Sequence, residues 1–384
     1  MKYELVGLGH SPKVAILCPR IQPDEIIKHY GDLLSVTYPL MVCDLYQDRT
    51  KKKTSNEAIK EYLADLMPNL VNAGINFLIV TQPDYFKVLS KQAKTDATIG
   101  DIYPSIVDGI SVTYMPNYSR VFYDPEKTTA KIKIGINSVI RWMNGDKAPI
   151  GKSIIKFEAY PSNDQEILDW LNKLYEMDCD LTCDIEGFDL KHYDAGVGTI
   201  TFCWNEHEGI AFAVDYQSIS DPAQPGIFGV EIKNHKIRRA LKKFFEVFRR
   251  KMIYHNICYD AYVLIYQLFM DHILDQEGLL YGLDVMLKNW DCSQIITYLA
   301  TNSCSGNELG LKVQAQEFAG NYAQEEIHDI TKIPLDKLLT YNLTDGLATW
   351  HVYNKNLPIM MADNQMGAYH QIFRPAVVDI IQMQ

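Results

Sequence analysis

Residues 181–188 read LTCDIEGF, a short strand-like segment that carries two carboxylates, Asp184 and Glu186. The two acids are i and i+2, so on a β-strand both side chains leave the same face. An ionised carboxylate on a core strand is costly unless it is paired or binds a metal ion. The segment therefore predicts one wall of a metal site, although such a pair standing alone is more common on a solvated edge strand.

A second segment places an acid close to the end of another strand. Residues 251–256, KMIYHN, have the apolar pattern of a short strand that ends at Asn256. The helix that follows carries Asp260 in its first turn, and Asn256 is well placed to cap that helix with its side chain. The pattern predicts that Asp260 lies at a strand-to-helix junction.

The third segment, YNLTD at residues 341–345, lies in a long helical stretch. Tyr341 and Asp345 are i and i+4 and share one helix face. Taken alone, such a pair is commonly packing plus a solvated charge. The three segments together predict a cluster of four carboxylates that would repel one another strongly. Two divalent cations about 4 Å apart would relieve the repulsion, and hard oxygen ligands favour Mg²⁺ or Mn²⁺.

The surrounding sequence has the order of a mixed α/β domain. Residues 154–160 read as a strand, and Ser162 with Gln165 forms a capping box before the next helix. The runs GTITFCW (198–204) and GIAFAVD (209–215) predict an antiparallel hairpin. From Asp291 onward the chain is predicted to be mostly helical.

The first 145 residues alternate between strand-like and helix-like segments, which predicts a separate three-layer α/β domain. They contain no phosphate-cradling glycine loop and no catalytic constellation. Residues 144–152, NGDKAPIGK, contain two glycines and a proline among polar residues and predict a linker. The predicted strands are 14–19, 34–44, 76–81 and 109–116, and the predicted helices are 23–34, 56–71, one after Pro83, and 130–143.

Composition limits the class of protein. The chain has 384 residues, 47% of them hydrophobic, and a net charge of −11, which excludes a nucleic-acid clamp that works by bulk positive charge alone. No apolar run approaches the roughly 18 residues of a membrane span, and the start lacks the apolar core of a signal peptide. The eight cysteines have no CxxC spacing, so we expect free thiols, a cytoplasmic location and no membrane partner.

Residues 233–251 are strongly basic, with nine lysines and arginines against one acid, Glu246. The segment is either a patch that tracks the backbone of single-stranded DNA or an ordinary helix with solvated charges. In the second case Phe244, Phe245 and Phe248 would form its core face.

The segments DIEGF, HNICYD and YNLTD resemble the three exonuclease motifs of the DEDD superfamily, in its tyrosine subclass. More narrowly, the chain resembles the 3′→5′ proofreading domain of family A (Pol I-like) DNA polymerases, particularly those of bacteriophages. Residues 289–320 are similar to the segment that precedes the third motif in that family, and residues 372–384 to the helix that leads into the polymerase. The resemblance covers roughly residues 150–384 and implies an RNase H-like (DnaQ-like) fold with a mixed sheet.

The resemblance also implies a role for each residue of the site. Asp184 would bridge two metal ions, Glu186 and Asp345 would hold the metal that activates the attacking water, and Asp260 would reach the second metal. Tyr341 would orient the water, since a phenol with a pKa of about 10 is a poor base at neutral pH. Asn256 would contact the terminal nucleotide, and Phe188 would pack near the terminal bases.

The implied activity is a metal-dependent 3′→5′ exonuclease that releases nucleoside monophosphates from single-stranded or frayed DNA 3′ ends. A polymerase module or other replication proteins would be its partners, and the location would be the host cytoplasm if a phage encodes it. None of the acidic motifs of a polymerase is found, so we expect no nucleotide polymerisation. The alternatives are an RNase D-like RNA exonuclease, which uses the same four acids and tyrosine, and a non-catalytic nucleic-acid-binding or docking module.

The expected domains are residues 1–148, 149–357 for the exonuclease, and 358–384 for the helical start of a connection to a polymerase module absent from this chain. The segments NFLIVTQPDYF (76–86) and SVTYMPNYSRVFYDP (111–125) are weakly similar to uracil-DNA glycosylase-like domains. The water-activating signature GQDPYH of those enzymes is missing. We therefore expect a structural or DNA-binding first domain without catalytic activity.

Overall fold

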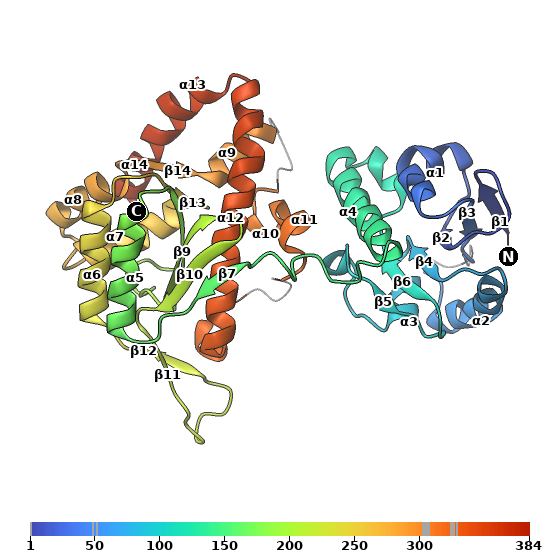
Figure 1. Cartoon of the computed structure of the whole chain (residues 1–384), viewed down its shortest axis with the longest axis horizontal. Helices are drawn as coiled ribbons and strands as arrows, with labels where there is room; N and C mark the ends of the chain where they lie inside the picture. Colours follow the sequence, from blue (N-terminus) through green and yellow to red (C-terminus); the bar gives the residue numbers. More distant parts are fainter. Residues whose placement is uncertain (1, 48–49, 51–52, 302–307, 323–326, 328) are drawn as a thin grey trace. The chain divides into compact units, whose positions relative to one another are not determined.

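The computed structural model describes residues 2–47, 50, 53–301, 308–322, 327 and 329–384. The chain forms two compact units, residues 1–152 and 153–384, and each is described by itself (Figure 1).

The first unit is built on a six-stranded sheet with the order β1-β3-β2-β4-β6-β5. Strands β2, β3, β4 and β6 are parallel, while β1 and β5 pair antiparallel at the two edges. Their apolar, β-branched runs suit a sheet that helices cover on both faces. The bounds are β1 Tyr3–Val6, β2 Val14–Cys18, β3 Leu40–Asp44, β4 Phe77–Val80, β5 Tyr103–Pro104 and β6 Ser111–Tyr114.

Two separate hydrophobic cores show that this unit has three layers. Ala15 and Leu17 of β2 pack in one core with helices α2 (Asn56–Asn72) and α3 (Pro83–Ser90). Val14 and Ile16 pack in the other with α1 (Pro23–Tyr30) and α4 (Pro125–Met143). The predicted three-layer α/β arrangement is confirmed.

Several details of the first unit differ from prediction; the helix predicted at 130–143, for example, begins at Pro125. The predicted strand at 34–44 begins only at Leu40, because Gly31–Ser35 forms a 3₁₀-helix that continues from α1. The edge strands β1 and β5 were not predicted, since each is short and has an exposed face without a clear apolar period.

The second unit has a six-stranded mixed sheet with the order β14-β13-β8-β9-β10-β7. Strands β14, β13 and β8 are parallel, β8, β9 and β10 are antiparallel, and β7 runs parallel to β10. Both the predicted hairpin, which is β9–β10, and the predicted α/β fold with a mixed sheet are confirmed. The bounds are β7 Phe157–Ala159, β8 Leu181–Glu186, β9 Thr199–Asn205, β10 Glu208–Ala213, β13 Met252–Tyr254 and β14 Trp290–Cys292; β11 Tyr216–Ser218 and β12 Gly229–Glu231 form a separate pair.

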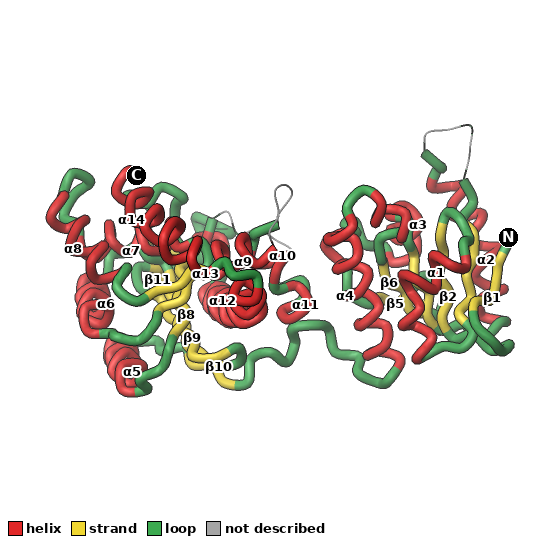
Figure 2. The backbone as a smooth tube through the Cα atoms, turned by 90° about the horizontal axis from the view of Figure 1, so that it is seen from above, coloured by secondary structure: helices red, strands yellow, loops and turns green. Residues whose placement is uncertain are grey.

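Helices cover the two faces of this sheet very differently (Figure 2). Five helices share one core with one face, namely α5 (Asp164–Glu176), α6 (His235–Val247), α7 (Ile257–Phe269), α8 (Gln276–Met286) and α14 (Arg374–Met383). The long helix α12 (Leu335–Ala362) crosses the other face over β8, β9 and β10. The remaining α-helices in the described part of this unit are α9 Ser293–Thr301, α10 Leu311–Gln314, α11 Gln316–Ala319 and α13 Met366–Ala368.

Helix α12 approaches the sheet closely at Gly346. A Cβ atom at this position would lie 2.7 Å from the sulfur of Cys203 and 3.0 Å from Cγ2 of Thr201. On the same side of that contact, the hydroxyl of Thr182 donates a hydrogen bond of 2.9 Å to the Gly346 carbonyl oxygen. Because Gly346 has no side chain, α12 can lie close to β8 and β9, and the hydrogen bond from Thr182 holds it there.

The predicted capping box of α5 is wrong by one position. Asn163, not Ser162, is the N-cap, and its Oδ1 accepts a hydrogen bond of 3.1 Å from the Glu166 backbone amide. Glu166, not Gln165, completes the box by accepting a bond of 2.8 Å from the Ser162 amide. Asparagine is at least as good a cap as serine, and Asn163 has the extended backbone that a cap requires.

The basic segment 233–251 forms α6 and the residues around it. Phe244 and Phe245 are buried in the core, so the interpretation of these phenylalanines as a core face is confirmed. Several of the charges are paired locally; Arg238, for example, binds the buried Asp215. The helix packs on the sheet face opposite to α12.

Within the described residues, no helix is long and apolar enough to cross a membrane. The seven cysteines in the described part of the chain are free thiols, and Cys304 lies outside it.

Candidate metal centre

The centre begins with strand β8, whose residues alternate between the two faces of the sheet. Leu181, Cys183 and Ile185 are buried in the large core. Asp184 and Glu186 leave the opposite face, toward α12, and are half-buried. The strand period thus places both acids on one side, as the sequence predicts.

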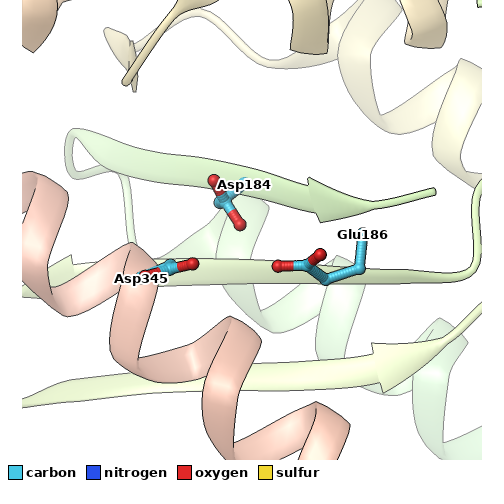
Figure 3. A group of neighbouring side chains, drawn as sticks. All are labelled: Asp184, Glu186 and Asp345. Atoms are coloured by element: carbon cyan, nitrogen blue, oxygen red, sulfur yellow. The ribbon is translucent and has the colours of Figure 1, made fainter. Parts of the chain in front are cut away.

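Helix α12 brings a third acid to the two from β8. Asp345 is 4% exposed, and one carboxylate oxygen from each of Asp184, Glu186 and Asp345 lies within 4.8 Å of the others (Figure 3). Their carboxyl groups point toward a common space between the strand and the helix. Three oxygen donors at this spacing can bind a single hard cation.

Polar contacts fix the helix relative to the strands at this point. The Asn342 side-chain amide donates a hydrogen bond of 2.7 Å to Oδ2 of Asp184. Its carbonyl oxygen accepts a bond of 3.1 Å from the hydroxyl of Thr199 on β9. Asn342 is fully buried, so both of its polar ends need these partners.

The fourth predicted acid, Asp260, lies beside the group of three. It is 3% exposed and lies on the first turn of α7. Burial raises the pKa of Asp260 well above its ordinary value, and the charges of Asp184 and Glu186 raise it further. Asp260 therefore interacts electrostatically with Asp184 and Glu186, but it is not one of the three acids whose carboxylate oxygens lie within 4.8 Å of one another.

The other three carboxyls show the same perturbation. Burial, followed by the charge of Asp345, raises the pKa of Asp184 well above its usual range. The pKa of Glu186 is raised by burial and then by Asp184 and Asp345, and that of Asp345 by burial. Neighbouring acids that repel one another when they ionise carry an excess of negative charge. Divalent cations can neutralise that charge and prefer carboxylate oxygens as ligands.

Tyr341 lies one turn before Asp345 on the same face of α12. Burial and the charge of Asp345 raise its pKa, so the phenol keeps its proton at neutral pH. The ammonium group of Lys312, on α10, donates a hydrogen bond to the Tyr341 oxygen and lies 3.6 Å from Oδ2 of Asp345. The hydroxyl of Tyr322 donates to Oδ1 of Asp345.

Sequence reasoning missed Lys312 and Tyr322. Lys312 lies in the 289–320 segment that resembles the family, but no role was assigned to it. Both residues reach the centre through the packing of α10 and the residues after α11 on α12, and no spacing in the sequence records that contact.

The two predicted substrate residues have different surroundings. The prediction that Asn256 caps α7 with its side chain is wrong: Asn256 is at the N-cap position, but its backbone is left-handed (φ 60°, ψ 51°) and its exposed side chain makes no cap hydrogen bond. A side-chain cap needs an extended backbone at this residue. Phe188 is half-buried and stacks on Tyr216, with the ring centroids 6.3 Å apart.

His255 joins the end of β13 to the segment that carries Lys312. Its Nδ1 lies 2.7 Å from the Ser293 hydroxyl, and its Nε2 lies 2.9 Å from the Leu309 carbonyl oxygen. Burial lowers the pKa of His255 to about 4, and the nearby charge of Lys312 lowers it too, while the bond to Leu309 opposes the shift. The ring is therefore neutral at pH 7 and acts as a fixed link.

No protein-family model and no curated protein sequence matches the chain. Among solved structures, it is similar to NrnC of Brucella melitensis with bound Mg²⁺, at 14% identity over 60% of this chain and 94% of that chain, with a TM-score of 0.36. It is similar to the catalytic core of RRP6 from Trypanosoma brucei at 10% identity, over 58% and 52% of the two chains, with a TM-score of 0.39. The chain is also similar to Escherichia coli RNase D, an exoribonuclease involved in structured RNA processing, at 15% identity over 59% of this chain and 50% of that chain, with a TM-score of 0.36.

Proposed function

We propose that the second unit is a metal-dependent 3′→5′ exonuclease, a hydrolase of phosphodiester bonds. One observation carries the proposal. Asp184, Glu186 and Asp345 bring carboxylate oxygens within 4.8 Å of one another between β8 and α12, Tyr341 lies one turn before Asp345, and the charges of Asp184 and Glu186 act on Asp260. These residues belong to the three segments that resemble the exonuclease motifs. The donor set consists of carboxylate oxygens, which suits two Mg²⁺ or Mn²⁺ ions.

The proposed roles are those that the resemblance to the exonuclease motifs implies. Asp184 would help to hold both cations, Glu186 and Asp345 would hold one of them, and Asp260 would hold the other. Bound cations would supply an activated water and neutralise the charge that develops on the leaving 3′ oxygen. Because Tyr341 keeps its proton, it donates or accepts a hydrogen bond that orients the water and does not act as a base.

The proposed substrate is the 3′ end of DNA, single-stranded or frayed, from which nucleoside monophosphates are released. Asn256 contacts the terminal nucleotide through its exposed side chain, and Phe188 lies near the terminal bases. In this proposal the chain is the proofreading part of a bacteriophage-type family A polymerase, with residues 149–357 as the exonuclease domain and 358–384 leading toward a polymerase module. Residues 1–148 are a non-catalytic domain.

The test uses the full chain and 5′-labelled oligonucleotides of one sequence, made as single-stranded DNA and as RNA. With Mg²⁺ or Mn²⁺ we expect a ladder that shortens from the 3′ end of the DNA, release of monophosphates, and no reaction in EDTA. Asp345→Asn is the matched inactive control. Preference for RNA would point to an RNase D-like enzyme, and tight oligonucleotide binding without cleavage would point to a docking module. Internal cuts, or full turnover in chelator, would overturn the proposal.

A further inference from the structure

Lys312, which the exonuclease motifs do not include, lies at the acidic centre. Its ammonium nitrogen lies 3.6 Å from Oδ2 of Asp345 and donates a hydrogen bond to the hydroxyl of Tyr341. The same nitrogen is 4.6 Å from the centre of the Tyr341 ring. One cation thus touches both the carboxylate and the phenol that α12 contributes to the centre.

The position of Lys312 is fixed by the packing of the residues around it. Leu311 and Ala315, on either side of Lys312, are buried against Leu339 and Leu343 of α12. Short helix α10 therefore rests its apolar side on α12 and directs the intervening lysine to the acids. The bond from His255 to the Leu309 carbonyl holds the start of this segment to the end of β13.

The charge of Lys312 acts on the whole cluster. It lowers the pKa of Asp184, Glu186 and Asp345 and so opposes the shifts that burial produces. In return, although burial disfavours the ammonium form, Asp345, Tyr341 and Glu186 raise the pKa of Lys312. An ammonium group 3.6 Å from a carboxylate oxygen of Asp345 compensates part of the negative charge of the acids.

We propose that Lys312 is a resident counter-cation of the acidic centre and the positioning residue of Tyr341. It competes with divalent cations for the charge of Asp345, and it holds the phenol oxygen at a fixed place beside the centre. The first part concerns the cluster alone, whereas the second rests on the proposed exonuclease function. The two parts predict effects of opposite sign on metal binding and on turnover.

The experiment compares the full chain with Lys312→Met, which keeps a flexible unbranched side chain, slightly shorter, and removes the charge, and with Lys312→Arg, which keeps the charge. Affinity for Mn²⁺ alone is measured by titration calorimetry in metal-free buffer at neutral pH. Losing a unit positive charge near the ligands strengthens cation binding, so we expect Lys312→Met to bind Mn²⁺ on the order of tenfold more tightly. Lys312→Arg should bind it as the wild type does.

Turnover is measured on the same samples with single-stranded DNA at saturating Mn²⁺ under single-turnover conditions. We expect Lys312→Met to slow cleavage by roughly tenfold or more, as loss of a positioning contact does. In a Tyr341→Phe background the same change should add little further loss of rate, because the hydroxyl it positions is gone, while the tighter Mn²⁺ binding should remain.

Each outcome decides one part. Unchanged or weaker Mn²⁺ binding by Lys312→Met would overturn the counter-cation role, because a merely structural lysine would disturb the ligands when lost. Tighter binding with an unchanged cleavage rate would overturn the positioning role. Tighter binding in a protein that never cleaves, wild type included, would leave the counter-cation in place and refute the exonuclease. Lys312→Gln repeats the measurement if the methionine variant does not fold.

Discussion

Strands β2 and β8 occupy the same place in two similar sheets, yet their side chains differ in kind. Each is the third strand of a six-stranded sheet with helices on both faces. All five residues of β2, VAILC, are completely buried and apolar. Strand β8 buries Leu181, Cys183 and Ile185 but carries Asp184 and Glu186 on its other face. Strand β2 is buried in a hydrophobic core on both faces, whereas β8 is buried in a core on one face and carries the two acids on the other.

The charge of the two units follows the same division. Residues 1–152 contain 19 lysines and arginines against 16 acids, whereas residues 153–384 contain 18 against 32. The layered α/β architecture alone therefore does not determine function. What distinguishes the second unit is that it tolerates unfavourable carboxylates at the centre of its sheet, and the comparison predicts that stability and activity separate on substitution.

The largest effect is expected for Asp184→Asn. Loss of a shared metal ligand should remove several kcal/mol of transition-state stabilisation, so cleavage should fall by about a thousandfold or more. The metal-free protein should melt at the same temperature or higher, because a neutral amide no longer repels Asp345 and can still accept the bond from Asn342. Cleavage assays and calorimetric melting in EDTA test both points.

The control for that experiment is Asp189→Asn, an exposed acid just after the strand, which should leave rate and melting unchanged. Wild-type cleavage by Asp184→Asn, or a melting temperature lower by several degrees, would remove the distinction drawn between the two strands.

The opposite result is expected for Ile16→Ala in β2. Ile16 is fully buried, so the truncation should reduce the free energy of unfolding of the first unit by about 2–5 kcal/mol. Ile16→Val, the milder control, should cost about 0.5–1.5 kcal/mol. Urea unfolding measures the loss, and cleavage at low temperature should match that of the wild type. A large loss of activity in folded protein would show that β2 is more than core.

A smaller effect is expected for Tyr341→Phe, which removes one hydroxyl and keeps the ring. The chemical step should slow by roughly a hundredfold, since only a positioning hydrogen bond is lost. Mn²⁺ affinity should stay nearly unchanged, because Tyr341 is not a predicted ligand. Tyr175→Phe, at an exposed position of α5, is the control and should cleave normally. Wild-type single-turnover rates for Tyr341→Phe would reduce this tyrosine to a packing residue.

The smallest effect concerns the buried His255 of the second unit. Its folded-state pKa of about 4 lies below the unfolded value of about 6.5, so the unfolded chain binds the proton more tightly. Stability is therefore fully present above pH 6.5 and is lost as pH falls toward 4, by about 2 kcal/mol between pH 7 and pH 5. The charged or polar neighbours of the ring are Lys312, Ser293 and the Leu309 carbonyl.

The measurement is the difference in unfolding free energy between the wild type and His255→Asn across this pH range. Other titrating groups cancel in the difference, which should shrink by about 2 kcal/mol on acidification. A difference independent of pH would mean that the ring accepts a proton in the folded state as easily as in the unfolded one.

Much of the fold follows from local pattern, and the failures have physical causes. The runs that became β2, β4 and β6 are continuous and apolar because helices cover both faces, and such runs are easy to recognise. The short strands β1 and β14 were not predicted, since three or four residues leave no measurable period. The cap of α5 moved by one residue because Asn163 competes with Ser162 for the same task.

The residues of the site likewise include some that local spacing predicts and others that it does not. Asp184, Glu186, Tyr341 and Asp345 were identified because each pair shares a face of one regular element, so geometry follows from spacing. Lys312 and Tyr322 reach the same acids only through packing of segments that are distant along the chain. No local rule contains that information.

Gly346 gives the centre a vulnerability that no list of its ligands would show. A glycine inside a helix weakens it by about 1 kcal/mol relative to alanine, so a stability engineer would replace it. Here the added methyl would lie 2.7 Å from the Cys203 sulfur and would push α12 away from β8 and β9. Asp345, the preceding residue, would move with the helix. Gly346→Ala, a conventional thermostabilising change, would therefore separate Asp345 from the acids of β8.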